Sequence, residues 1–151
     1  MVYDRDLASA PAGPLVYWDT GYGSLVDVAF GDGLAGTQTA EIFLSPVGGA
    51  TVKLLGLDLG AWLSAPRNTQ VTILDGLGAT LWSSGAIQVQ DTTNLVFDLE
   101  STSGIRIQWG PTAYYVAVDN LAFEVVPEPA AAALLALGLA ALGRLRPSAA
   151  S

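Results

Sequence analysis

The sequence predicts an all-β protein: a single antiparallel β-sandwich of the jelly-roll or another Greek-key type, followed by a short C-terminal hydrophobic helix. Short runs of alternating apolar and polar residues are separated by Gly, Pro and Asp-Gly, which is typical of antiparallel strands and their turns. No helical period of useful length occurs before residue 130. Ala and Leu, the best helix formers, then dominate residues 130–143. We therefore expect roughly eight to ten short strands before the helix.

The length of 151 residues allows one domain with one core. We divide the chain into five segments. These are an irregular lead-in or half an edge strand (1–14), the sandwich (15–126), a Pro-Glu-Pro motif (127–129), a hydrophobic helix with a basic end (130–146) and a tail (147–151).

The first part of the sandwich shows short strands interrupted by turn residues. We expect strands at 15–19, 26–30 and 41–44, each followed by glycine or proline. In the long apolar run 52–59 the pattern changes phase near Leu54. One extra residue there would restore a common face, so we expect a β-bulge or a strand buried on both sides.

The later strands alternate more cleanly. Residues 70–75 and 80–84 flank Gly76-Leu77-Gly78 and predict a hairpin with a glycine-containing loop. Further strands are expected at 95–100, 105–109, 114–118 and 121–125, with a turn or kink at Asp119-Asn120. Trp109 continues an apolar face and is expected in the core.

The composition excludes several functions. Fourteen acidic and six basic residues give a formal net charge of −8, which disfavours nucleic acids and peripheral binding to anionic membranes. The chain has no Cys and no His, so thiol nucleophiles, the usual zinc sites and Ser-His-Asp catalysis are absent. We expect no catalytic residues and no enzymatic activity.

Aromatic residues are the candidates for ligand binding. Their faces stack on the apolar C–H side of sugar rings. Trp18, Tyr22 and Trp62 lie at predicted strand ends or loops, where binding residues concentrate. The alternative interpretation is that these side chains belong to the core.

Acidic residues supply two further hypotheses. Asp4, Asp19 and Asp119 could provide oxygen ligands to a structural calcium ion where the first and last strands meet, although no spacing matches an EF-hand. Their alternative role is capping turns or facing solvent. Asp98 and Glu100 have the carboxylates that a glycosidase needs, but their alternation in one strand favours a solvated face.

The C-terminal segment has the composition of a targeting or membrane-anchoring segment. Residues 130–143 would form a helix of roughly 21 Å, shorter than the ~30 Å hydrocarbon core of a bilayer. A core helix, a signal-peptide-like segment and a short membrane anchor all fit that length. The run has no polar face, and Arg144 and Arg146 directly follow it, which favours the membrane anchor.

The order of these parts resembles the PEP-CTERM sorting domain of Gram-negative bacteria. The resemblance rests on Val126, Pro127, Glu128 and Pro129, the apolar helix, and Arg144 and Arg146. It implies an exosortase as partner, anchoring in the inner membrane before processing, and delivery to the cell surface or the extracellular polysaccharide matrix. The basic cluster holds only two Arg, and residues 147–151 follow it. Residues 1–6 lack a signal peptide, so we expect that Met1 is not the true start.

The sandwich loosely resembles galactose-binding-like domains, some of which hold structural calcium. The similarity covers residues 55–62, the Asp75-Gly76 turn and residues 118–123. We therefore expect a non-catalytic module that binds extracellular polysaccharide. A structural surface protein without a defined sugar site is the alternative, and a carboxylate-dependent hydrolase is a third hypothesis.

Overall fold

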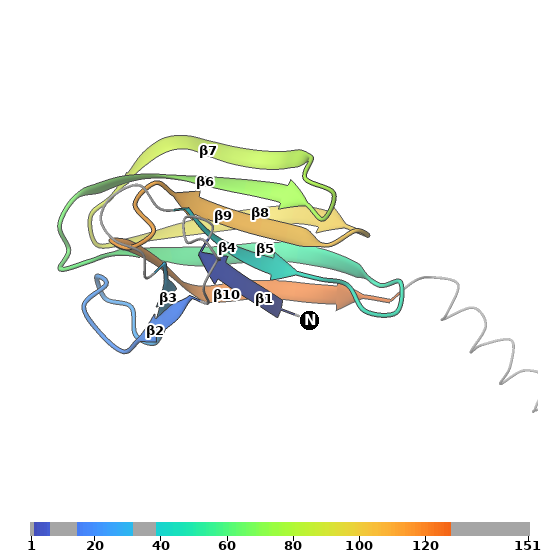
Figure 1. The fold of residues 1–151 in the computed structure, drawn as a ribbon, viewed down its shortest axis with the longest axis horizontal. Coiled ribbons are helices and arrows are strands. Elements are labelled where there is room, and N and C mark those ends of the chain that lie inside the picture. The colour runs from blue at the N-terminus through green and yellow to red at the C-terminus, as the bar shows by residue number, and fades with distance from the viewer. Residues whose placement is uncertain (1, 7–14, 32–38, 128–151) are drawn as a thin grey trace, which may run out of the picture.

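The computed structural model describes residues 2–6, 15–31 and 39–127 (Figure 1). Within these residues the chain forms antiparallel strands that are short at the N-terminal end and longer from residue 51 onward. They are β1 (Val2–Asp6), β2 (Val16–Trp18), β3 (Val28–Phe30), β4 (Ala40–Leu44), β5 (Thr51–Ala61), β6 (Arg67–Asp75), β7 (Thr80–Val89), β8 (Thr92–Ser101), β9 (Ile105–Gly110) and β10 (Val116–Val126).

The strands form two five-stranded sheets. Sheet A has the order β1-β4-β9-β6-β7, and sheet B has the order β2-β3-β10-β5-β8. All pairings between these strands are antiparallel. The prediction of an all-β, two-sheet antiparallel sandwich is confirmed. The predicted helix at 130–143 lies outside the described residues, among which no helix is long and apolar enough to cross a membrane.

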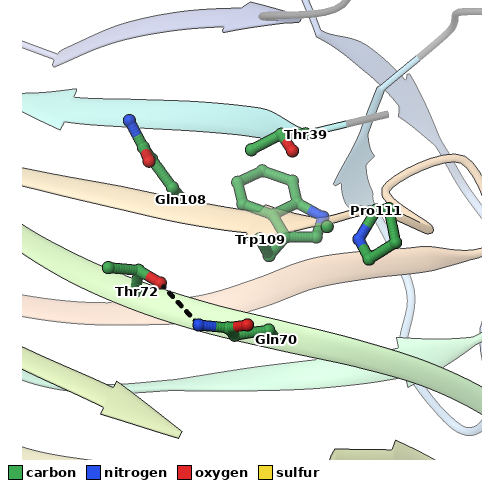
Figure 2. A pocket seen from close by; sticks show the side chains of 7 residues that line it. Thr39, Gln70, Thr72, Gln108, Trp109 and Pro111 are labelled. Carbon is green, nitrogen blue, oxygen red and sulfur yellow. Dashed lines mark hydrogen bonds between the residues drawn. The ribbon is translucent and has the colours of Figure 1, made fainter. Parts of the chain in front are cut away.

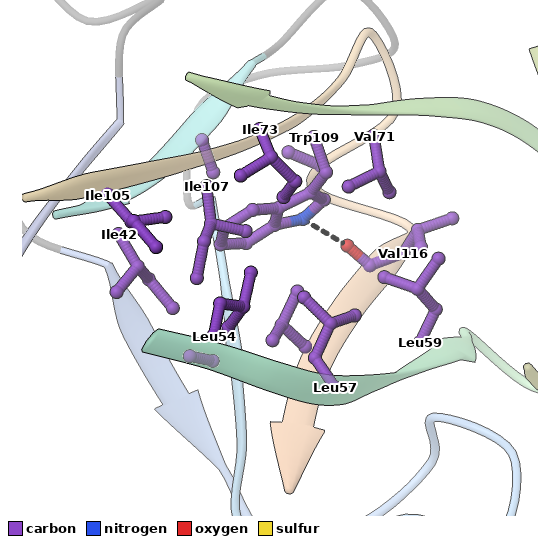
Figure 3. Packing of buried hydrophobic residues seen from close by; sticks show 14 of the residues in the cluster. Ile42, Leu54, Leu57, Leu59, Val71, Ile73, Ile105, Ile107, Trp109 and Val116 are labelled. Carbon is purple, nitrogen blue, oxygen red and sulfur yellow. Dashed lines mark hydrogen bonds between the residues drawn. The ribbon is translucent and has the colours of Figure 1, made fainter. Parts of the chain in front are cut away.

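The main core lies between the two sheets, and Trp109 is among its largest members (Figure 3). Trp109 is 1% exposed, which confirms its predicted place in the core. Its indole Nε1 donates a hydrogen bond of 2.8 Å to the backbone oxygen of Val116 in the opposite sheet. A buried indole N–H without a partner would lower the stability of the fold, so this hydrogen bond allows the tryptophan side chain to occupy the core.

The predicted bulge in the long central strand is present. In β5 the register against β8 shifts between Leu54 and Gly56. Leu54, Leu57 and Leu59 are all at most 1% exposed, because the extra residue returns the later leucines to the inward face. The phase change in the sequence therefore records a bulge.

The last strand bends where the sequence suggested a turn or kink. Asn120 has a left-handed φ of 49°, and the β10 register against β5 shifts between Asp119 and Ala122. The strand nevertheless continues to Val126. The closing segments 114–118 and 121–125 are thus parts of one irregular strand, except that Tyr114 and Tyr115 precede it in a turn.

Of the two N-terminal expectations, the first needs adjustment and the second agrees with one of its alternatives, an edge strand. The strand expected at 26–30 is shorter, because Asp27 adopts a φ of 58°, and Val26 lies outside the strand with 59% of its surface exposed. Within the lead-in 1–14, residues Val2–Asp6 form β1 at the edge of sheet A.

A second hydrophobic cluster lies on the outer side of sheet B. In β3, Ala29 belongs to the main core, whereas Val28 and Phe30 belong to a separate cluster with Tyr22, Leu25 and Ala117. Side chains alternate between the faces of a strand, so this cluster is on the side away from the main core. The loop between β2 and β3 covers the sheet there.

Candidate functional site

Five aromatic side chains surround a hollow next to this second cluster, which we call the aromatic pocket. It has a volume of about 180 Å³ and is lined by Trp18, Tyr22, Phe30, Trp62 and Tyr114. Among the described residues that line it, none carries a charge. Its walls therefore consist mainly of ring faces and edges.

The pocket forms at one end of sheet B, next to the short strand pair β2–β3. Trp18 is the last residue of β2, Phe30 is the last residue of β3, and Trp62 directly follows β5. Tyr114 lies in the turn before β10. Because β3, β10 and β5 are consecutive neighbours in sheet B, Phe30, Tyr114 and Trp62 meet at one end of the sheet. Trp18 is the register partner of Val28 on the antiparallel strand β2, so it shares the outer face with Phe30.

Tyr22 is the centre of the pocket. Its side chain is 2% exposed, and its ring centroid lies 5.0 Å from that of Trp62 and 5.4 Å from that of Phe30. The phenol donates a hydrogen bond of 2.6 Å to the backbone oxygen of Tyr114. Burial, with a smaller contribution from Tyr114, raises the pKa of Tyr22 well above its ordinary value. Tyr22 is therefore a neutral, fixed wall of the pocket.

Backbone hydrogen bonds join the β2–β3 loop, the turn after β5 and the turn before β10. The Leu63 amide donates to the Gly21 oxygen at 2.6 Å, and the Trp62 amide donates to the Tyr115 oxygen at 2.8 Å. Gly21 has a φ of 99°, and a Cβ added there would lie 2.6 Å from Cζ3 of Trp62. Only glycine satisfies both the left-handed backbone and the close approach of the indole.

The accessible rings are at the mouth of the pocket. Trp18 is 49% exposed and Tyr114 is 36% exposed, whereas Phe30 is 7% exposed. The Tyr114 ring also meets Tyr115 edge to face at 5.0 Å, and the Arg67 guanidinium lies 4.3 Å above the Tyr115 ring. The pocket thus offers two exposed aromatic surfaces on a rigid base.

The sequence-based candidates meet in this pocket. Trp18, Tyr22 and Trp62 all line it, although whether they contact a ligand stays a prediction. Phe30 and Tyr114 were not among the three residues that the sequence pattern singled out. Phe30 ends a strand immediately before Gly31, and Tyr114 follows the Pro111-Thr112 turn, so both had the strand-end position that marked Trp18.

The proposed calcium ligands are not gathered in the described part of the chain. Asp119 lines a third hollow with Asp27, whereas Asp19 is not among its lining residues. Among the described residues, no group of three or more acidic, His or Cys side chains is arranged so that it could hold a metal ion. The side chain of Asp4 lies outside the described part, so calcium binding stays a prediction.

The remaining candidate residues are on the surface or outside the described range. Asp98 and Glu100 are exposed, and Asp98 forms an ion pair of 2.6 Å with Lys53, which raises the pKa of Lys53. Val126 and Pro127, which belong to the expected sorting motif, are exposed at the end of β10. The other motif residues, Glu128, Pro129, Arg144 and Arg146, lie outside the described residues.

The described residues form an antiparallel β-sandwich with an aromatic pocket at one end. Two solved structures resemble this fold in part. No protein-family model and no curated protein matches the sequence. A CBM4 carbohydrate-binding module is similar over 74% of this chain and 86% of its own, with 14% identity and a TM-score of 0.44. The enzymatically active domain of tailspike protein 4 from bacteriophage CBA120 is similar over 83% of this chain and 19% of its own, with 10% identity and a TM-score of 0.35. Both similarities are remote, and neither identifies a ligand.

Proposed function

We propose that the sandwich is a non-catalytic module that binds extracellular polysaccharide, and that the aromatic pocket holds one sugar ring. The convergence of five aromatic side chains from separate chain segments on one uncharged hollow carries this proposal. Aromatic faces bind the C–H side of a pyranose ring, and hydroxyl groups can remain in contact with water at the open mouth.

The size of the pocket determines how much of a chain it takes. Pockets for drug-sized ligands have volumes of roughly 300–1,000 Å³. The aromatic pocket, at about 180 Å³, is smaller and suits a single ring. The exposed faces of Trp18 and Tyr114 are the surfaces on which that ring stacks.

The test titrates the full chain with the extracellular polysaccharide of its host by calorimetry. Removing an aromatic ring on which a nucleic-acid base stacks costs about 1–3 kcal/mol, and with a similar loss for a sugar Trp18→Ala should weaken binding by about fivefold to 150-fold. Tyr17→Ala is the matched control, because Tyr17 is an exposed aromatic on the same strand that lines a different hollow. Equal affinities of the two variants would remove the aromatic pocket from the binding site.

A structural role without a defined sugar site is the second candidate. It is favoured by the contacts of Tyr22 and Phe30 with Leu25 and Val28, because these rings also form the second hydrophobic cluster. If the folded wild-type chain takes up no host polysaccharide, with or without added calcium, this role replaces the proposed one.

We further propose that residues 126–146 are a PEP-CTERM sorting signal, so that the protein is exported, anchored in the inner membrane and then released to the cell surface or matrix. The order of Pro127, Glu128 and Pro129, the apolar run and the two Arg supports this proposal. In a host that carries an exosortase, Glu128→Ala should accumulate the unprocessed form, as measured by the mass of the membrane-bound protein. Identical processing in a strain without the exosortase would contradict it.

A further inference from the structure

A second hollow lies on the outer face of sheet A, and we call it the polar hollow. It has a volume of about 280 Å³. Figure 2 shows its side chains on β6, on β9 and beside the start of β4. Its lining residues are Thr39, Gln70, Thr72, Gln108, Trp109, Gly110 and Pro111.

Strand alternation explains why the polar side chains gather there. On β6, Val71 and Ile73 point into the main core, so Gln70 and Thr72 stand on the opposite face. Gln108 on β9 is the register partner of Thr72 and shares that outer face. The polar hollow and the aromatic pocket therefore lie on opposite sheets and share no lining residue.

Hydrogen bonds engage the NH₂ groups of both glutamine amides, and the carboxylate partner fixes the orientation of Gln108. Gln108 Nε2 donates to the Glu41 carboxylate at 2.7 Å, and a carboxylate accepts only from the NH₂ side of the amide. Gln70 Nε2 donates to Ser83 Oγ at 3.1 Å and to Thr72 Oγ1 at 3.4 Å. Both NH₂ groups are thus engaged. Within the described part of the chain, no group donates to the Oε1 atom of either glutamine.

The uncharged lining limits which ligands suit the polar hollow. None of the described residues that line it is charged. Glu41, which lies behind Gln108, is neutralised by an ion pair of 3.0 Å with Arg106. A ligand in the hollow thus meets two amide oxygens and two threonine hydroxyls, but no cation. Hydroxyl or N–H donors fit this lining, whereas a carboxylate or sulfate would face acceptors without a counter-charge.

We propose that the polar hollow is a second carbohydrate site, specific for uncharged, hydroxyl-rich sugar units, in which Gln70 and Gln108 accept hydrogen bonds from the ligand. The proposal goes beyond the aromatic pocket and does not depend on it. Pro111 adds an exposed apolar ring at the edge of the hollow.

The test follows the side-chain amide NMR signals of Gln70 and Gln108 in the full chain during titration with cello-, laminari-, malto- and xylo-oligosaccharides, and with oligogalacturonate. At least one neutral series should shift both signals, and oligogalacturonate should shift neither. Trp18→Ala should preserve these shifts, which separates this site from the aromatic pocket. The proposal is overturned if no neutral series moves the signals, or if oligogalacturonate moves them equally.

Point variants then measure how much Gln70 contributes to the affinity for the oligosaccharide. Gln70→Ala removes one acceptor, so it should weaken binding of the active oligosaccharide about threefold to tenfold in calorimetry. Gln90→Ala is the matched control, because Gln90 is an exposed glutamine outside the lining. Gln70 is exposed and its partners are hydroxyls, so the melting temperature of Gln70→Ala should equal that of the control. Equal affinities of two folded variants would overturn the role of Gln70.

Discussion

The Glu41 carboxylate and the Arg106 guanidinium form an ion pair of 3.0 Å on the outer face of sheet A, where the Glu41 side chain is only 2% exposed. Arg106 also lies 4.2 Å above the Phe43 ring, and its Nε donates to the Gly76 oxygen at 3.3 Å. This cation therefore connects β9 to β4 and to the hairpin loop of β6 and β7.

Arg106→Met should lower the free energy of unfolding by about 3 kcal/mol, because it removes a cation that is paired with a buried carboxylate. Lys53→Met is the control. It breaks the ion pair with Asp98, which is 82% exposed, so its unfolding free energy should stay close to that of the wild type. Urea denaturation of both variants measures the difference, and equal losses would contradict the stabilising role of the buried pair.

Gly21→Ala should cost about 2 kcal/mol more than Gly78→Ala. The two glycines have nearly equal φ values, 99° and 95°, so alanine meets similar backbone strain at both. A Cβ at Gly78 has no atom within 4 Å, whereas one at Gly21 meets Trp62. Thermal unfolding measures the excess, which belongs to the displaced indole. Gly21→Ala should also impair polysaccharide binding.

Tyr22 should make stability depend on alkaline pH. Burial raises its folded pKa above the ordinary value of 10.0, so above this pH the unfolded state loses the proton more readily. The free energy of unfolding should be fully retained below pH 10.0 and fall as the pH rises beyond it. Tyr22→Phe should lose about 1 kcal/mol at neutral pH with the hydrogen bond to Tyr114, and its alkaline decline should be shallower. Parallel pH profiles would refute this.

Trp109→Phe should lower the free energy of unfolding by about 2–4 kcal/mol, because it leaves a cavity and a buried Val116 carbonyl without its donor. Trp18→Phe serves as the control, since Trp18 is 49% exposed. Chemical denaturation followed by circular dichroism is suitable, because it does not depend on the tryptophans that are changed. A loss below that of Trp18→Phe would show that the indole N–H contributes little.

The strands and the core could be predicted because alternation records burial directly. Ile105, Ile107 and Trp109 share one face in the sequence and are all at most 1% exposed. The bulge near Leu54 was predictable for the same reason, as a change of phase. The shortened strand at Val28–Phe30 was not, because the left-handed Asp27 leaves no trace in hydrophobicity.

The site was only partly predictable. Strand ends could be located, which selected Trp18 and Trp62, but the neighbours of an end depend on strand order in the sheet. Phe30 and Tyr114 join the pocket because β3 and β10 pair with each other, at Ala29 and Val118, although they are distant in sequence. Glu41 alternates with inward-facing residues, so the sequence pattern predicts a solvent-exposed side chain. Its burial depends on what covers the outer face of sheet A, which alternation does not encode.

The course of β10 determines how the protein would carry mechanical load. Tyr114 of the aromatic pocket precedes the strand, and Pro127 follows it after 11 residues, or about 36 Å of extended chain (Figure 1). If the tail holds the protein to a surface while the pocket holds a polymer, part of the pull enters at Trp62, at the end of β5, and leaves at the far end of β10. The hydrogen bonds between β10 and β5 are perpendicular to the strand axes, so they would resist the pull together in shear.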